Sequence, residues 1–162
     1  MKLTLDISAP SSLWRKLPRA RAMARETVMA CVAESGFEAP EGAQVSLLLT
    51  DDAEVRALNA KWRGQDKSTN VLSFPSAGPD RLRRSPTLGD VALAFETLAR
   101  EAEASGVSLA DHYRHLVAHG FLHLIGYDHE TDEDAERMEA LETQTLVRLG
   151  VGDPYADGAA GE

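Results

Sequence analysis

The sequence predicts a single α+β domain in which a small mixed sheet of about four short strands is packed by about five helices. The 162 residues are enough for one ordinary domain, and 43% hydrophobic with 27% charged residues is typical of globular proteins. Segments that alternate apolar and polar residues are interspersed with segments of helical periodicity. We expect the domain to cover residues 1–150 and residues 151–162 to form a flexible tail.

The first elements are predicted from alternation and from helix-start residues. Residues 2–7 alternate apolar and polar side chains, as a half-buried strand does. Pro18 suits the first turn of a helix that runs to about Glu34. Residues 44–49 are a short apolar segment that predicts the second strand.

The next helix is predicted to begin after Thr50, which we expect to be its N-cap, and to end at Gly64. Acidic residues fill its first turn, where the helix dipole favours them. Leu58 and Trp62 lie on one face of this helix, and we expect Trp62 to be a core residue.

Two more strands are predicted in the middle of the chain, over residues 71–74 and 88–95. Pro75 ends the first of them. The segment 76–87 between them is rich in arginine, proline and glycine, and we expect an exposed, basic, mobile loop.

Three helices complete the prediction. The first covers residues 96–104, and the second begins at a capping box formed by Ser108 and Asp111 and runs to about Ile125. The last covers about residues 132–149. The acidic run over residues 130–142 is expected to form a solvated face of that last helix.

Composition excludes several classes of protein. No apolar run approaches the roughly 20 residues that span a bilayer, and residues 1–8 lack the apolar segment of a signal peptide, so we expect a cytoplasmic protein. The single cysteine, Cys31, excludes an internal disulfide and a cysteine-rich metal site. The net charge is −9, and residues 101–162 hold 3 basic against 14 acidic residues. Any contact with nucleic acid is therefore expected in the first hundred residues.

The histidines are the most informative feature, because all five lie within residues 112–129. His119 and His123 are four residues apart and share one helix face, and Gly126 allows the chain to turn so that His129 can approach them. Three imidazoles around one ion with an open fourth position are typical of a catalytic zinc site. We therefore predict a metal site at the end of this central helix, with one Zn²⁺ per chain.

The same spacing occurs in metzincin proteases, which have a glutamate directly after the first histidine as general base. Here that position is Gly120, which disfavours peptide hydrolysis by that route. Among the other histidines, we expect His115 to pack beside the ligands and His112 to be solvated or to contribute to a helix cap.

Two further residues are candidates for chemistry. Arg63 ends its helix and could contact a phosphate through two N–H groups, or equally could pair with Asp66 as a stabilising residue. Asp128 could be a turn residue, could orient an imidazole or could transfer protons, and the turn role is favoured.

Three blocks of the sequence resemble the YbeY family of bacterial endoribonucleases. They are residues 59–75, residues 88–91 and residues 119–129, and the last is the most specific. Ser68 departs from the proline that this family often has in the first block.

The resemblance implies an α+β fold with His119, His123 and His129 as zinc ligands and Arg63 as a functional residue in the cleft. It implies metal-dependent cleavage of single-stranded RNA, including maturation of the 16S rRNA 3′ end and ribosome quality control. The expected partners are the 16S rRNA precursor and the small ribosomal subunit with its proteins; no membrane and no particular oligomeric state are predicted. Two alternatives stay open: a non-catalytic ribosome assembly factor with a structural zinc, and a metallohydrolase with another substrate.

Overall fold

The computed structural model of the chain describes residues 3–152, and it confirms the predicted α+β class with a four-stranded mixed sheet. Residues 1–2 and most of the predicted tail lie outside the described residues. In chain order the elements are β1 (Thr4–Ser8), η1 (Ser12–Lys16), α1 (Ala20–Ser35), β2 (Gln44–Thr50), α2 (Asp52–Arg63), β3 (Val71–Pro75), η2 (Pro79–Arg84), β4 (Thr87–Ala94), α3 (Phe95–Ser105), α4 (Leu109–Leu124) and α5 (Asp132–Arg148).

The strands lie in the order β1-β2-β4-β3. The first three are parallel, and β3 runs antiparallel to β4 at the edge of the sheet. The β2–β4 register shifts next to Gly89, whose φ of 140° few other residues adopt. A Cβ at Gly89 would lie 2.3 Å from the carbonyl oxygen of Phe74 on β3, so this position requires glycine.

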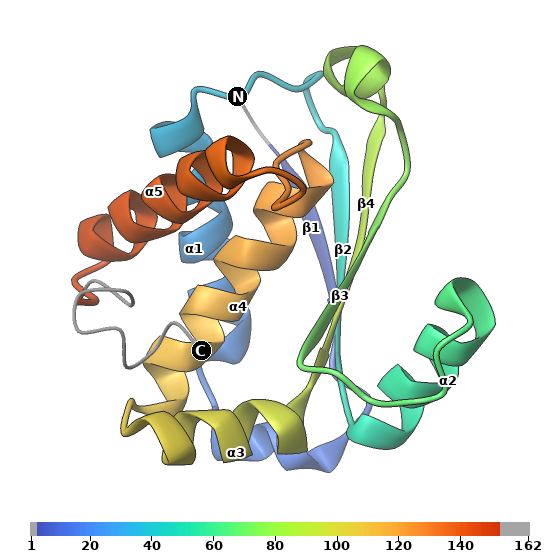
Figure 1. Cartoon of the computed structure of the whole chain (residues 1–162), viewed down its shortest axis with the longest axis vertical. Coiled ribbons are helices and arrows are strands. Elements are labelled where there is room, and N and C mark those ends of the chain that lie inside the picture. Colours follow the sequence, from blue (N-terminus) through green and yellow to red (C-terminus); the bar gives the residue numbers. More distant parts are fainter. Residues whose placement is uncertain (1–2, 153–162) are drawn as a thin grey trace.

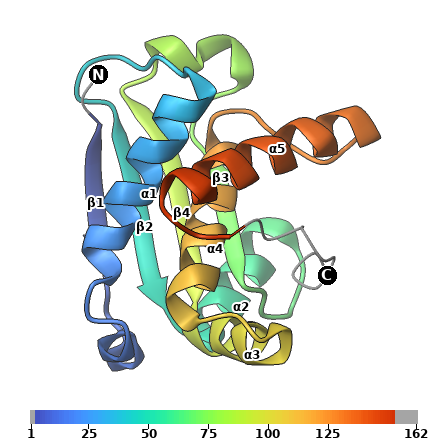
Figure 2. The ribbon, with the colours of Figure 1, turned by 90° about the vertical axis from the view of Figure 1, so that its left-hand side faces the viewer.

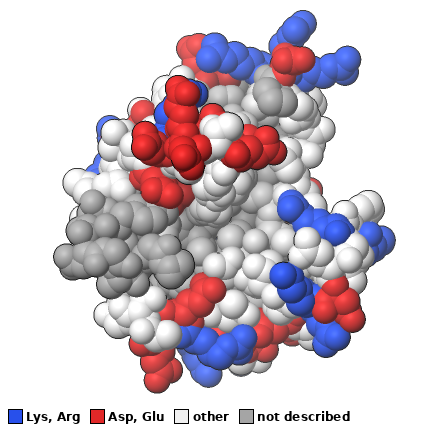
Figure 3. All heavy atoms as spheres, viewed as in Figure 1, with Lys and Arg blue, Asp and Glu red and all other residues white. Residues whose placement is uncertain are grey.

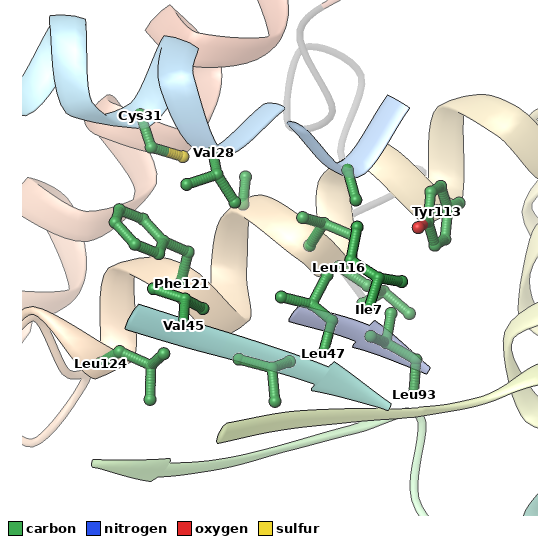
Figure 4. Close-up of a cluster of buried hydrophobic side chains, with 14 of the residues drawn as sticks. Ile7, Val28, Cys31, Val45, Leu47, Leu93, Tyr113, Leu116, Phe121 and Leu124 are labelled. Atoms are coloured by element: carbon green, nitrogen blue, oxygen red, sulfur yellow. The ribbon is translucent and has the colours of Figure 1, made fainter. Parts of the chain in front are cut away.

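Helices cover the two faces of the sheet unequally. α1, α4 and α5 lie on one face, whereas α2 lies on the other, as the two views show (Figures 1 and 2). The main core fills the space between the sheet and α1 and α4, with Val28, Val45, Leu47 and Phe121 among its members (Figure 4). A smaller cluster of Val55, Leu72, Ala92 and Ala94 holds α2 against its face.

Element boundaries agree with the predictions to within a few residues, with two corrections. Asp51, and not Thr50, is the N-cap of α2, and its Oδ1 accepts a hydrogen bond of 2.9 Å from the Glu54 amide. Thr50 is the last residue of β2, because the strand continues until its pairing with β4 ends at Ala94. Phe95 was expected in the strand but begins α3, where it packs beside Trp14.

Trp62 was expected in the core, and this is wrong, since it is 64% exposed. α2 turns Val55 and Asn59 toward the protein, and Trp62 falls outside that face. The buried tryptophan is Trp14 on η1, an element that the sequence pattern did not predict. Its Nε1 donates a 2.8 Å hydrogen bond to the Thr50 carbonyl.

The segment 76–87 is largely exposed, as its composition predicts, but it is not without regular structure. It contains η2, and Leu82 inserts into the main core with 5% exposure. Its arginines remain outside, where Arg83 lies 3.8 Å from the Glu38 carboxylate. Leu82 therefore joins an otherwise exposed, arginine-rich segment to the main core.

Charge is unevenly distributed on the visible face (Figure 3). Acidic side chains gather over α5, whereas basic and acidic side chains are mixed at η2, at α2 and along the lower edge over α3, with largely uncharged surface between these regions. Among the residues that the structure describes, no helix has the length and apolar character needed to cross a membrane.

Candidate metal centre

α4 brings two of the predicted ligands together because its other faces are held in the core. Leu116, Val117 and Phe121 are buried, which leaves His119 and His123 half-buried on the remaining side. Their rings meet edge to face with centroids 4.6 Å apart, and their Nε2 atoms are 3.1 Å apart. Which nitrogen donates in this contact depends on the tautomers of the two imidazoles.

The turn after α4 brings in the third ligand. The helix ends at Leu124, and Gly126 adopts a φ of 105°, which few other residues adopt. The chain then reverses, and the ring of the exposed His129 stacks on His119 at 4.9 Å and meets His123 at 5.0 Å. One nitrogen from each of the three imidazoles lies within 4.8 Å of the others.

A buried carboxylate lies behind these ligands. Glu142 of α5 is fully buried, and its two oxygens bond His119 Nδ1 at 2.9 Å and His115 Nε2 at 2.7 Å. His115 thus packs beside the ligands as predicted. Glu142 corrects the prediction that the whole acidic run to residue 142 is solvated.

Burial and charge set the protonation of the site. Burial, reinforced by the imidazoles of His119 and His129, lowers the pKa of His123 to about 4, so this ring is neutral at neutral pH. Burial alone would raise the pKa of Glu142, but hydrogen bonds from His115 and His119 outweigh it and hold this pKa well below its usual range. The site therefore presents neutral imidazole backed by an ionised carboxylate, which is the form that binds divalent metals.

His112 was expected to be solvated or to cap a helix, and this is wrong. Its side chain is 14% exposed, and its Nε2 lies 2.8 Å from the Glu101 carboxylate of α3. The pair is a third histidine–carboxylate contact on α4, outside the candidate metal centre.

Arg63 lies in the same pocket as the histidines. The pocket has a volume of about 580 Å³, and it is lined by Arg63, β3, the start of the 76–87 segment, His119, His123 and Asp128. Arg63 donates a hydrogen bond to the Ser73 carbonyl, and its guanidinium lies 5.3 Å from the Phe74 ring centre. It does not pair with Asp66, which instead binds Arg56 at 2.7 Å. Arg63 from α2 and two of the histidines from α4 therefore line one pocket.

Asp128 has a visible turn role, since its Oδ1 accepts a 3.1 Å hydrogen bond from the Glu130 amide. It also lines the pocket, which places a carboxylate beside the imidazoles.

Gly120 is required by the close packing of α4 on the sheet. A Cβ there would lie 2.8 Å from Val91 Cγ1 and 3.2 Å from Val71 Cγ2. The Ser73 hydroxyl also donates a 2.9 Å hydrogen bond to the Gly120 carbonyl. Position 120 thus faces β3 and β4 and has no space for a glutamate side chain, so the glutamate base of the metzincins has no counterpart here.

The donor set fits a divalent metal ion. Nitrogens on a tetrahedral zinc lie about 3.3 Å apart, given Zn–N distances of about 2.0–2.1 Å. The 3.1 Å separation of the His119 and His123 Nε2 atoms is close to that value, and one nitrogen of His129 lies within 4.8 Å of a nitrogen of each. All three predicted ligands could therefore hold one ion.

Fold and site together define an α+β protein with a three-histidine group that could hold a metal ion, beside an arginine-containing pocket. The model of the family described as Endoribonuclease YbeY matches residues 14–150. The chain belongs to this family, which confirms the resemblance found in its sequence.

Curated relatives agree with the family model. A protein of Methylocella silvestris named Endoribonuclease YbeY is 46% identical, over 97% of this chain and 88% of its own length. Another of that name, from Azorhizobium caulinodans, is 49% identical over 98% of this chain and all of its own length. The solution structure of TM1509 from Thermotoga maritima is similar in fold, with a TM-score of 0.55 and 22% identity, covering 96% of this chain and 95% of that one.

Sequence reasoning missed Glu142 and Ser73. A signal for Glu142 exists, because it follows Met138 by four residues and precedes Leu146 by four, and both are buried. An acidic residue in register with a buried helix stripe indicates a specific partner. Ser73 carries no comparable signal, since its partner is a backbone carbonyl on a distant helix.

Proposed function

We propose that this chain is a zinc-dependent endoribonuclease that hydrolyses phosphodiester bonds of single-stranded RNA. The observation that carries the proposal is that two of the three imidazoles that could hold a metal ion, His119 and His123, line one pocket together with Arg63. Membership in a family described as endoribonucleases supports RNA as the substrate.

His119, His123 and His129 are the proposed ligands. These residues would hold a zinc ion, which when bound would supply Lewis acidity toward a phosphate oxygen and lower the pKa of bound water. Neutral His123 needs no proton removed before it binds metal at neutral pH, because its pKa is already lowered to about 4.

Arg63 is the proposed phosphate-binding residue. Its contacts with the Ser73 carbonyl and the Phe74 ring hold the guanidinium plane at the pocket wall. A fixed planar guanidinium can meet two phosphate oxygens and can stabilise the charge that grows on them in the transition state. Asp128 is the candidate for proton transfer, since it lines the pocket while its Oδ1 holds the turn.

The proposed substrate in the cell is the 3′ end of the 16S rRNA precursor, within maturation and quality control of the small ribosomal subunit. The charge distribution supports delivery by a partner, because a chain of net charge −9 has little general affinity for RNA. Single strands are favoured, because the scissile bond must enter a pocket that a duplex cannot follow.

The test is cleavage of a defined single-stranded RNA by chain stripped of metal with a chelator and then supplied with zinc. We expect cleavage to disappear on chelation and to return with one equivalent of zinc. His123→Ala should abolish stoichiometric zinc binding, because only two of the three imidazoles would remain. Cleavage that survives chelation and this substitution would point to a contaminant, and would leave a ribosome assembly factor with a structural zinc as the better explanation.

Arg63→Glu tests the phosphate contact. It should abolish cleavage and leave zinc content unchanged, because Arg63 is not a ligand. The matched control is Arg56→Glu, on the same helix but paired with the exposed Asp66, which should keep full activity. Equal activity of the two variants would make Arg63 structural, and activity on phosphodiesters or peptides but not on RNA would favour another metallohydrolase.

A further inference from the structure

Glu142 is an unusual residue to find beneath this site. Its carboxylate is fully buried between α4 and α5, on the same helix stripe as the buried Met138 and Leu146. An apolar residue would suit that stripe better, because burying an ionised carboxylate carries a desolvation penalty that its partners do not always repay. The position is therefore poorly explained by packing alone.

The two bonds of Glu142 determine which nitrogen of His119 carries the proton. An ionised carboxylate only accepts hydrogen bonds, so His119 must donate from Nδ1. In the neutral ring, Nε2 is then left with its lone pair. Nε2 is the atom that faces His123 at 3.1 Å, on the side where the three imidazoles converge.

His115 fixes the carboxylate in turn. Its Nε2 bonds the second Glu142 oxygen at 2.7 Å, so the carboxylate is held at both ends by α4. Rotation of Glu142 away from His119 would break this bond within a fully buried site, where an unmade hydrogen bond is expensive.

We propose that Glu142 is a positioning residue that holds His119 in the tautomer protonated on Nδ1, with Nε2 directed at the metal, and that His115 holds Glu142 in place. The inference rests on the proposed metal centre. Carboxylates that bind the second nitrogen of a ligand histidine orient the ring and raise its basicity, and their loss weakens metal binding by about 10- to 100-fold.

The test measures zinc affinity by competition with a chromogenic chelator, independently of RNA cleavage. Glu142→Gln keeps the volume of the side chain but removes the charge and allows the amide to flip toward either tautomer. We expect it to bind zinc about 10-fold more weakly, and Glu142→Leu, which removes both bonds, to approach 100-fold. His115→Gln should show a smaller loss, because the Glu142–His119 bond remains.

The matched control is Glu101→Gln. It removes the charge of an α3 carboxylate that is bonded to His112, a histidine of α4 outside the candidate metal centre. It should leave zinc affinity unchanged. If Glu142→Leu fails to fold, Glu142→Gln still decides the question. Zinc affinity within twofold of wild type in folded Glu142→Gln would overturn the proposal.

Nitrogen-15 NMR of the metal-free chain near pH 8 provides a second readout. His119 should be protonated on Nδ1 in the wild type and should become a mixture of tautomers in Glu142→Gln. A wild-type His119 protonated on Nε2 would overturn the inference. If zinc affinity falls as expected while RNA is never cleaved, only the proposed function fails; if the wild type binds no zinc, both fail.

Discussion

Gly120→Ala is the substitution that most directly tests how α4 is held against the sheet. The added Cβ would lie 2.8 Å from Val91 Cγ1, which is 0.6 Å short of the 3.4 Å at which ordinary van der Waals contact begins. Val71 Cγ2 at 3.2 Å and Ser73 Oγ at 3.3 Å close the other directions. The surrounding side chains, the helix or the strands must therefore shift, and we expect part of the shift to reach His119, the adjacent residue on the helix.

Two opposing effects decide the sign of the change in stability. Replacing glycine by alanine within a helix stabilises it by about 0.5–1 kcal/mol. Overpacking a filled core costs about 1–3 kcal/mol, and we expect this effect to be larger because strand side chains surround the new methyl group. A net loss of about 1 kcal/mol corresponds to a melting temperature lower by about 2–4 °C for a chain of this size.

Thermal unfolding of metal-free chain and zinc competition are the two assays. Gly120→Ala should melt at lower temperature and bind zinc more weakly. Val91→Ala combined with Gly120→Ala should lose less than the sum of the single changes, because the smaller strand residue makes room for the methyl group. A Gly120→Ala chain that melts higher than wild type with unchanged zinc affinity would refute the reasoning.

A change of pH and a change of one buried side chain test how buried polar groups affect the stability of the fold. The lowered pKa of His123 means that the unfolded chain binds more protons than the folded chain between pH 6.5 and about 4, so metal-free protein should lose stability as pH falls through that range. His123→Gln should flatten this part of a profile of urea midpoint against pH. A flat profile for the wild type would contradict this prediction. The lowered pKa of Glu142 adds a loss at still lower pH. Tyr113→Phe removes the 2.8 Å bond to the Ala20 carbonyl and should cost about 1 kcal/mol in urea unfolding, and no loss would show that this bond contributes nothing net.

The elements and the histidine group could be predicted because their signals are local. Helix periodicity, a capping serine and a glycine after the helix fix α4 and its end, and the spacing of His119, His123 and His129 follows from that. Each of these inferences uses residues within a few turns of one another.

The errors in the sequence-based predictions arise at residues whose structure is determined by a partner far away in the sequence. Thr50 and Asp51 are both good N-caps, and the pairing of β2 with β4 decides that Thr50 belongs to the strand. Trp62 has core character, yet the face that α2 buries is set by contacts with β3 and β4. Glu142 is a partner of His119 because α5 packs on α4, and that packing is not encoded near either residue.

The histidine group and Arg63 differ in how the chain assembles them. The three imidazoles come from α4 and the turn after it, within residues 119–129, whereas β3, which Arg63 contacts through Ser73, meets α4 through a Ser73–Gly120 hydrogen bond between residues 47 positions apart. Contacts between near neighbours in the chain form faster than contacts between distant segments. With the proposed metal site, we therefore expect newly made or partly denatured protein to bind an ion before the whole pocket has formed, so that metal content alone would be a poor measure of how much of a preparation is correctly folded.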